Sequence, residues 1–372
     1  MILQGIDVLE KNEFRPLRRR KVGLITNYSF VTKDMRQGLD VLIQNNINVV
    51  KIFTPEHGLY GLPDGETFND TLHPKYKIPV ISLYGKKKKP ESNDLEDIDI
   101  LVYDIQDVGL RYYTFIYTLA YTLEAASENG IDYLVLDRIN PLGRKVYGPR
   151  IPDKLSSFVG DYLLPTRYGL TPGELAQYFL RLKKLDLELK VIPLEGWGGE
   201  GFNQTDLLWN VPSPALPTYE ATLCYAGICF LEATNVSEGR GTPKPFQYIG
   251  APWVDNDELY EFLKDMFPNL ILRKREFIPR FGKYAQQLCF GVEFFPKFED
   301  NFFEVSISLL HYLSKYPEMK IDKHISRLMG DELALEIATG KTDVNVWRKS
   351  AEEFIDTVSD LLIYGGNLYY DS

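Results

Sequence analysis

The sequence contains few of the residues that hold structural metals or form disulfide bonds. Among its 372 residues there are three cysteines and four histidines. Cys224, Cys229 and Cys289 all stand among apolar residues, without the spacing of zinc ligands or a paired framework. We therefore interpret them as small buried hydrophobic residues, and the sequence predicts neither a metal site nor a cofactor.

The chain also lacks an excess of positive charge and any long apolar run. Its formal net charge of -10 argues against a general nucleic-acid-binding surface, since phosphate backbones require a basic footprint. No stretch is long enough to span a bilayer, and Met1 to Leu9 lacks the pattern of a signal peptide. A cytoplasmic protein is the default prediction, and an exported one is expected if a signal has been removed. No oligomeric state is predicted.

Motifs typical of other enzyme classes are absent or out of place. There is no Gly-x-Ser-x-Gly elbow and no Walker loop. The segment from Gly196 to Gly201 matches the dinucleotide fingerprint G-x-G-x-x-G, but no small-residue helix start follows it. The first predicted strand is followed by Thr26-Asn-Tyr28 in place of a glycine-rich loop. These observations argue against NAD binding.

Strand and helix patterns alternate over the first half of the chain. Short apolar runs predict strands at residues 21–26, 49–53, 80–83, 98–104, 133–137 and 191–194. Apolar positions at helical spacing predict helices at 38–44, 116–129 and 171–185. This alternation predicts the α/β class, with a Rossmann-like parallel sheet in the N-terminal domain.

A passage rich in glycine and proline, residues 196–217, indicates a change of domain. We therefore predict a catalytic domain at 1–195 and a smaller α+β domain at 196–372 that closes the active-site cleft. For the second half the patterns predict strands at 227–233, 271–278 and 291–295, and helices at 303–313 and 347–362.

A carboxyl group and an imidazole follow one of the predicted strands directly. Pro55 ends the strand at 49–53, and Gly58 permits a tight turn, so Glu56 and His57 are held at the strand's carboxyl end. Ligands of open α/β sheets bind at that edge, and these two side chains can move protons. A solvated turn, or one that caps the next helix, is the structural alternative.

Polar residues also follow the next two strands. After the strand at 98–104 come Asp104, Gln106, Asp107, Arg111 and Tyr113. If the strands are parallel neighbours, these side chains line one crevice with Glu56. Asp107 could instead cap the next helix, and Arg111 could pair with Asp104.

Two further clusters carry groups that could bind a ligand. Arg138 and Asn140 follow the strand that ends at Asp137. In the second half, the segment 232–243 contains Asn235, Glu238 and Arg240 beside glycines that allow close backbone approach. From the local sequence, a turn that merely carries polar side chains is about as good an interpretation of this last cluster.

With these residues in view, the chain resembles the exo-β-N-acetylmuramidase family of bacteria. The resemblance spans most of the chain in order, and it rests on residues 53–58, 79–85, 104–109, 111–114, 136–141, 169–175, 212–214 and 234–241. It implies hydrolysis of terminal N-acetylmuramic acid from the non-reducing end of peptidoglycan fragments. It also implies a cleft between the two domains, with Glu56 as the catalytic residue. One departure is Tyr168, where the family often has histidine.

The implied reaction needs a proton donor, a second group that activates water or acts as nucleophile, and a cation that binds the lactyl carboxylate. Glu56 could protonate the leaving oxygen, and His57 could orient it or hold the sugar. Asp104, Asp107 or Asp137 could activate water, or the acetamido group of the sugar could act as nucleophile. For the lactyl carboxylate of muramic acid we favour Arg111, with Arg240 second and Arg138 also a candidate. A non-catalytic protein that binds muropeptides or amino sugars in the same cleft is the alternative function.

Overall fold

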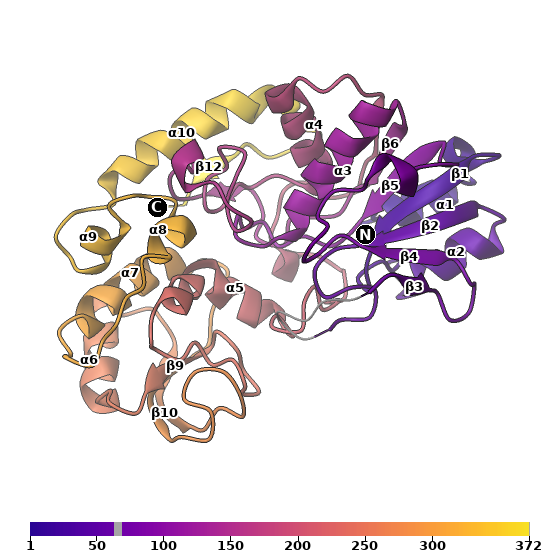
Figure 1. Cartoon of the computed structure of the whole chain (residues 1–372). Helices are drawn as coiled ribbons and strands as arrows, with labels where there is room; N and C mark the ends of the chain where they lie inside the picture. Colours follow the sequence, from indigo (N-terminus) through magenta and orange to yellow (C-terminus); the bar gives the residue numbers. More distant parts are fainter. Residues whose placement is uncertain (63–68, 372) are drawn as a thin grey trace.

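The N-terminal half is built around a largely parallel sheet (Figure 1). The computed structural model describes residues 1–62 and 69–371. Within them the strand order is β3-β4-β2-β1-β5-β6-β8, and β3 pairs antiparallel with β4 at one edge. The strands are β1 (Lys21–Thr26), β2 (Asn48–Thr54), β3 (Thr71–Leu72), β4 (Pro79–Ser82), β5 (Ile100–Asp104), β6 (Asp132–Leu136) and β8 (Leu189–Ile192). The predicted α/β class and Rossmann-like layer are confirmed.

Helices cover both faces of this sheet. The helices α1 (Gly5–Lys11) and α2 (Gly38–Gln44) pack on one face, and α3 (Phe115–Asn129) and α4 (Pro172–Lys183) on the other. Successive strand residues point to opposite faces, so Leu101 belongs to the core under α3 and Val102 to the core on the other side. Because both faces are buried, the central strands are apolar throughout.

The C-terminal half combines a small antiparallel sheet with helices. Its strand order is β10-β11-β9. The strands are β9 (Tyr248–Ala251), β10 (Leu272–Phe277) and β11 (Cys289–Phe294). The helices are α5 (Tyr219–Ile228), α6 (Asn256–Met266), α7 (Phe302–Leu313), α8 (Ile325–Met329), α9 (Ala334–Ala338) and α10 (Asn345–Val358). Short 3₁₀ helices lie at Arg15–Leu17, Ser92–Asp94, Asp153–Leu155, Phe202–Gln204, Cys229–Ala233 and Ser359–Leu361. Among the described helices, none has both the length and the apolar character needed to cross a membrane.

The strand predicted at 227–233 is wrong, because that segment is helical. Helix α5 is capped at its start, where the hydroxyl of Thr218 accepts from the amide of Ala221 at 3.1 Å. Gly227 lies so close to α7 that an added Cβ would come 1.8 Å from the carbonyl oxygen of Phe302. A helix that is buried nearly all round has no polar face, so periodicity cannot distinguish it from a buried strand. The other four elements predicted for this half are found as β10, β11, α7 and α10.

The end of the chain returns to the N-terminal half. Its strand β12 (Tyr369–Tyr370) pairs in parallel with β7 (Lys145–Val146). The hydroxyl of Tyr364 donates to Oδ2 of Asp137 at 2.6 Å. Burial raises the pKa of Asp137 to about 7, while the Tyr364 hydrogen bond acts in the opposite direction. Asp137, a candidate for activating water, is therefore occupied in fastening the C-terminal segment to the sheet.

Candidate active site

The turn after β2 holds its two reactive side chains in a fixed geometry. His57 has φ 67° and Gly58 has φ 63°, so two successive residues adopt the left-handed region. Nδ1 of His57 donates to the carbonyl oxygen of Leu62 at 2.8 Å, which closes the turn from the far side. Left-handed backbone at a residue other than glycine is uncommon and often occurs at functional sites.

Glu56 is tied to the start of α3. The hydroxyl of Thr114, the residue just before that helix, donates to Oε2 of Glu56 at 2.7 Å. Glu56 is half-buried, and His57 beside it is 7% exposed. The carboxyl group is thus held in one position while part of it remains accessible, as the prediction from the sequence requires.

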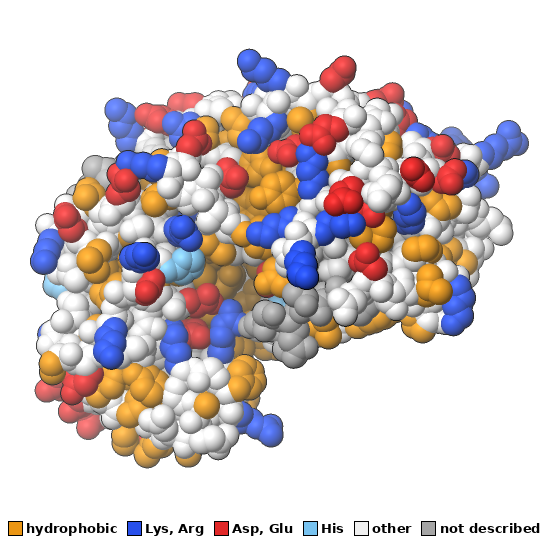
Figure 2. Space-filling view, in the orientation of Figure 1, with side chains coloured by type: hydrophobic (Ala, Val, Ile, Leu, Met, Phe, Trp, Pro, Cys, Tyr) orange, Lys and Arg blue, Asp and Glu red, His pale blue; other side chains and the backbone are white. Residues whose placement is uncertain are grey.

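Glu56 and His57 line a cavity of about 450 Å³ between the two halves of the chain. Figure 2 shows this side of the molecule hollowed between them. The N-terminal wall includes Tyr113 and Thr114, which lead into α3. The described residues that line the cavity are Glu56, His57, Tyr84, Tyr112, Tyr113, Thr114, Phe115, Phe158, Val159, Ser213, Ala215, Leu216, Tyr225, Glu232, Glu238, Arg240, Phe246 and Lys283. Such a volume, with aromatic and charged walls, suits a sugar.

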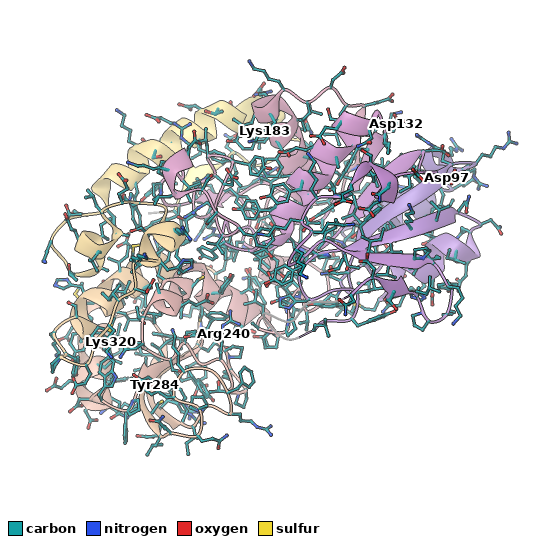
Figure 3. All side chains as sticks on the ribbon, in the orientation of Figure 1. Asp97, Asp132, Lys183, Arg240, Tyr284 and Lys320 are labelled. Atoms are coloured by element: carbon teal, nitrogen blue, oxygen red, sulfur yellow. The ribbon has the colours of Figure 1, made fainter. Side chains whose placement is uncertain are left out.

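The wall contributed by the C-terminal half carries two carboxylates and two cations. Nη2 of Arg240 donates to Oε1 of Glu232 at 2.8 Å, and Nζ of Lys283 donates to Oε2 of Glu238 at 2.8 Å. Nε of Arg240 lies 3.5 Å from Oε1 of Glu238, which joins the two pairs into one network. In Figure 3 Arg240 lies at the edge of the C-terminal half that faces the N-terminal half.

This network controls the ionisation of Glu232. Burial raises the pKa of the Glu232 carboxyl, and the charge and hydrogen bond of Arg240 act against that rise. Glu238 raises the same pKa further, whereas Lys283 lowers it. A carboxyl group with a raised pKa in a cavity is a candidate for proton transfer.

The group Asp104, Gln106 and Arg138 does not line this cavity. Nε of Arg138 donates to Oδ1 of Asp104, and both side chains are almost completely buried. Burial raises the pKa of Asp104 to about 6, although Arg138 acts in the opposite direction. Gln106 and Arg138 border a separate cavity of about 20 Å³, room for about one water molecule. The proposed pair of Arg111 with Asp104 is therefore wrong, because Arg138 takes that place.

Asp107 and Asn140 also lie away from the cavity and hold loops together. Oδ2 of Asp107 accepts from the amide of Gly109 at 2.8 Å and from the hydroxyl of Tyr168. Burial raises the pKa of Asp107 to about 6. Nδ2 of Asn140 donates to the carbonyl oxygen of Leu170 at 3.1 Å. Tyr168, which departs from the family pattern, is fully buried and supports Asp107.

Arg111 is buried between the two halves of the chain. Its Nη2 donates to the carbonyl oxygen of Leu328 at 2.8 Å, and its Nη1 donates to that of Arg327 at 3.1 Å. With 0% of its surface exposed, it does not line the cavity. Asn235 likewise makes backbone contacts elsewhere, accepting from the amide of Lys320 at 2.8 Å. Arg111 therefore fastens α8 to the N-terminal half and is not placed to meet a ligand in the cavity.

Five of the predicted site residues therefore line the cavity: Glu56, His57, Tyr113, Glu238 and Arg240. Sequence reasoning missed Glu232 and Lys283. Glu232 is the first residue of the segment 232–243, which the sequence marks as a possible ligand-binding cluster, so its carboxyl group could have been included among the candidates. Lys283 follows a glycine in a polar loop, and no local pattern marks it.

Two family models together match most of the chain. The model described as "Exo-beta-N-acetylmuramidase NamZ, N-terminal" matches residues 22–220, and the corresponding C-terminal model matches residues 223–364. The peptidoglycan beta-N-acetylmuramidase NamZ of Bacillus subtilis (strain 168) is 38% identical over 97% of this chain and 91% of its own length.

Solved structures of similar proteins have the same fold. Two crystal structures of DUF1343 family proteins from Bacteroides fragilis match almost the whole chain. One has a TM-score of 0.89 and 31% identity, covering 98% of this chain and 99% of that one. The other has a TM-score of 0.80 and 30% identity, covering 99% and 100%. The similarity thus extends over both halves of the chain.

Proposed function

Because this chain belongs to the family of the exo-beta-N-acetylmuramidase NamZ, we propose that it hydrolyses terminal N-acetylmuramic acid from peptidoglycan fragments in the cavity at Glu56. The terminal muramic acid is the one at the non-reducing end, because a β-N-acetylmuramidase breaks the glycosidic bond at C1 of the muramic acid. The observation that supports this site best is the position of Glu56: a carboxyl group fixed by Thr114 and facing a wall that carries two cations.

In this proposal Glu56 is the general acid. Glycoside hydrolysis needs a proton on the leaving oxygen as the bond to the sugar breaks. Thr114 holds Oε2 of Glu56, which leaves Oε1 to face the glycosidic oxygen. His57 is fixed by the hydrogen bond from its Nδ1 to the carbonyl oxygen of Leu62 and lines the same cavity, where it can orient Glu56 or contact the sugar. The turn thus presents both groups from one rigid segment.

We propose Glu232 as the second carboxylate. Asp104, Asp107 and Asp137 are buried in structural contacts, whereas Glu232 lines the cavity from the opposite half. Its ion pair with Arg240 stabilises the ionised form that can activate water or stabilise positive charge on the sugar ring. The acetamido group of the substrate is the alternative nucleophile, and Glu232 would then orient it.

Arg240 and Lys283 are the cations proposed for the lactyl carboxylate. Both line the cavity, and their charges are held on the same wall by Glu232 and Glu238. A carboxylate ligand that enters this network adds charge-assisted hydrogen bonds to groups already positioned. A molecule with net charge -10 needs such local cations to attract an anionic sugar.

Release of free sugar tests this function. A disaccharide of N-acetylmuramic acid linked to N-acetylglucosamine should yield both monosaccharides when incubated with the protein. Chromatography of the products detects them, and calorimetry measures binding in parallel. Binding without any release would favour the non-catalytic sugar-binding protein instead.

The pH dependence of kcat/KM should follow the charges around Glu232. An ionised Glu232 is required, so activity falls as the pH drops through its raised pKa. Glu238 raises that pKa, so Glu238→Gln should move the acidic limb to lower pH. Lys283 lowers it, so Lys283→Met should move the limb to higher pH, whatever its effect on the maximal rate. An aryl muramide serves as substrate, and shifts in the same direction for both variants would contradict the role of Glu232.

A further inference from the structure

A loop with four consecutive lysines, Lys86–Lys89, lies next to the cavity. Two of them are neutralised: Lys87 pairs with Asp94 at 2.9 Å, and Lys89 pairs with Glu128 at 2.6 Å. Lys88 differs, because its Nζ lies 4.0 Å from the centroid of the Phe158 ring. Within the described part of the chain, no carboxylate lies within ion-pair distance of Lys88. Its charge is therefore held in place by an aromatic ring.

The ring that holds Lys88 belongs to the cavity. Phe158 lines it together with Tyr84, and the two ring centroids are 6.0 Å apart with an interplanar angle of 42°. The rings form an aromatic edge on the N-terminal wall, the same wall that carries Glu56. Aromatic surfaces of this kind pack against sugar rings, so Lys88 stands at the end of a surface on which a glycan can lie.

A peptidoglycan strand supplies a second negative charge at a defined place. N-acetylmuramic acid and N-acetylglucosamine alternate, so a strand that begins with muramic acid carries another lactyl group two sugars further along. The terminal lactyl carboxylate is assigned above to Arg240 and Lys283 on the opposite wall. The second carboxylate, on the part of the substrate that leaves, has no cation assigned to it.

We propose that Lys88, held over Phe158, forms a subsite for a carboxylate on the leaving part of the substrate. The inference rests on the proposed function. The carboxylate has two possible sources: the free lactyl group of the second muramic acid, or a peptide attached to it. In both cases Lys88 makes the protein favour longer fragments over a monosaccharide glycoside.

The test compares two substrates in one set of variants. An aryl muramide has no second carboxylate, whereas a peptide-free tetrasaccharide that begins with muramic acid has one. Lys88→Met removes the charge and retains an apolar side chain over Phe158. It should lower the ratio of kcat/KM for the tetrasaccharide to kcat/KM for the aryl muramide by about fivefold, the upper range for a partly exposed ion pair. Lys86→Met, which removes an exposed neighbouring charge, should leave that ratio unchanged.

A third substrate distinguishes the sources of the carboxylate. When a stem peptide is attached, the lactyl group becomes an amide and the negative charge moves to the peptide. If Lys88→Met lowers the kcat/KM ratio only for the peptide-free tetrasaccharide, Lys88 binds the lactyl carboxylate. If it lowers the ratio only for the peptide-bearing tetrasaccharide, Lys88 binds a carboxylate of the peptide. An unchanged ratio for both, or an equal fall in Lys86→Met, overturns the subsite. If the wild type does not cleave the aryl muramide, the proposed function fails, and the subsite fails with it.

Discussion

Glu56→Gln is expected to reduce the release of N-acetylmuramic acid by a factor on the order of 10² to 10⁴, because an amide cannot deliver the proton to the leaving oxygen. The fold should persist, since the amide oxygen of glutamine can still accept the hydrogen bond from Thr114. The disaccharide of N-acetylmuramic acid and N-acetylglucosamine is the substrate of choice, because its sugar leaving group needs the proton that an aryl group can do without. Release of free sugar from it and thermal unfolding, measured on the same preparations, separate the two effects.

A matched control is Glu124→Gln. Glu124 is also half-buried and also accepts a hydroxyl hydrogen bond, from Tyr162 at 3.0 Å, but it does not line the cavity. Its activity should equal that of the wild type. A rate close to that of the wild type in Glu56→Gln would remove Glu56 from the chemistry.

Arg240→Met is expected to abolish most of the preference for muramic acid over N-acetylglucosamine. The two sugars differ in the lactyl group, so discrimination must rest on the cations that meet its carboxylate. Loss of a partner from a buried charge pair costs on the order of 2–5 kcal/mol. Because the Arg240 side chain is 25% exposed, we expect the low end, about 2 kcal/mol or roughly thirtyfold in the ratio of the two kcat/KM values.

The ratio is informative because Arg240 also pairs with Glu232. Damage to Glu232 slows both substrates alike, whereas a lost lactyl contact slows the muramic substrate alone. Arg240→Lys should restore part of the preference, since it keeps the charge. Arg111→Met is the contrasting variant. It should lower the free energy of unfolding, because the carbonyl oxygens of residues 327 and 328 lose their hydrogen-bond donors. It should not alter the ratio of the two kcat/KM values. An unchanged ratio in Arg240→Met would direct attention to Lys283.

Much of the N-terminal fold could be predicted because its signals are local. The strand that ends just before Pro55 and the helix that ends just before Gly130 are defined by residues within a few positions of each boundary. The helix at 219–228 could not be distinguished from a strand, because its burial depends on α7, which lies far away in the sequence. The local composition indicates that such a segment is buried, but it does not indicate which element the segment packs against.

The candidate site was predicted in part for a similar reason. Asp104 does lie at the carboxyl end of a parallel strand, as Glu56 does. However, side chains at that edge point toward two different cavities, and Asp104 meets Arg138 on the side away from Glu56. The sequence favours Arg111 as a ligand for the lactyl carboxylate, but the carbonyl groups to which it donates come more than 200 positions later in the chain. Such long-range partners leave no local pattern in the sequence.

The proposed function is cleavage of β-glycosides of terminal muramic acid in the cavity at Glu56. The most direct measurement is the rate at which the protein releases the aryl group from β-glycosides of N-acetylmuramic acid and of N-acetylglucosamine, assayed side by side. We predict rapid cleavage of the muramic compound and much slower cleavage of the other. Cleavage of neither compound, or equal rates for both, would contradict the proposed function.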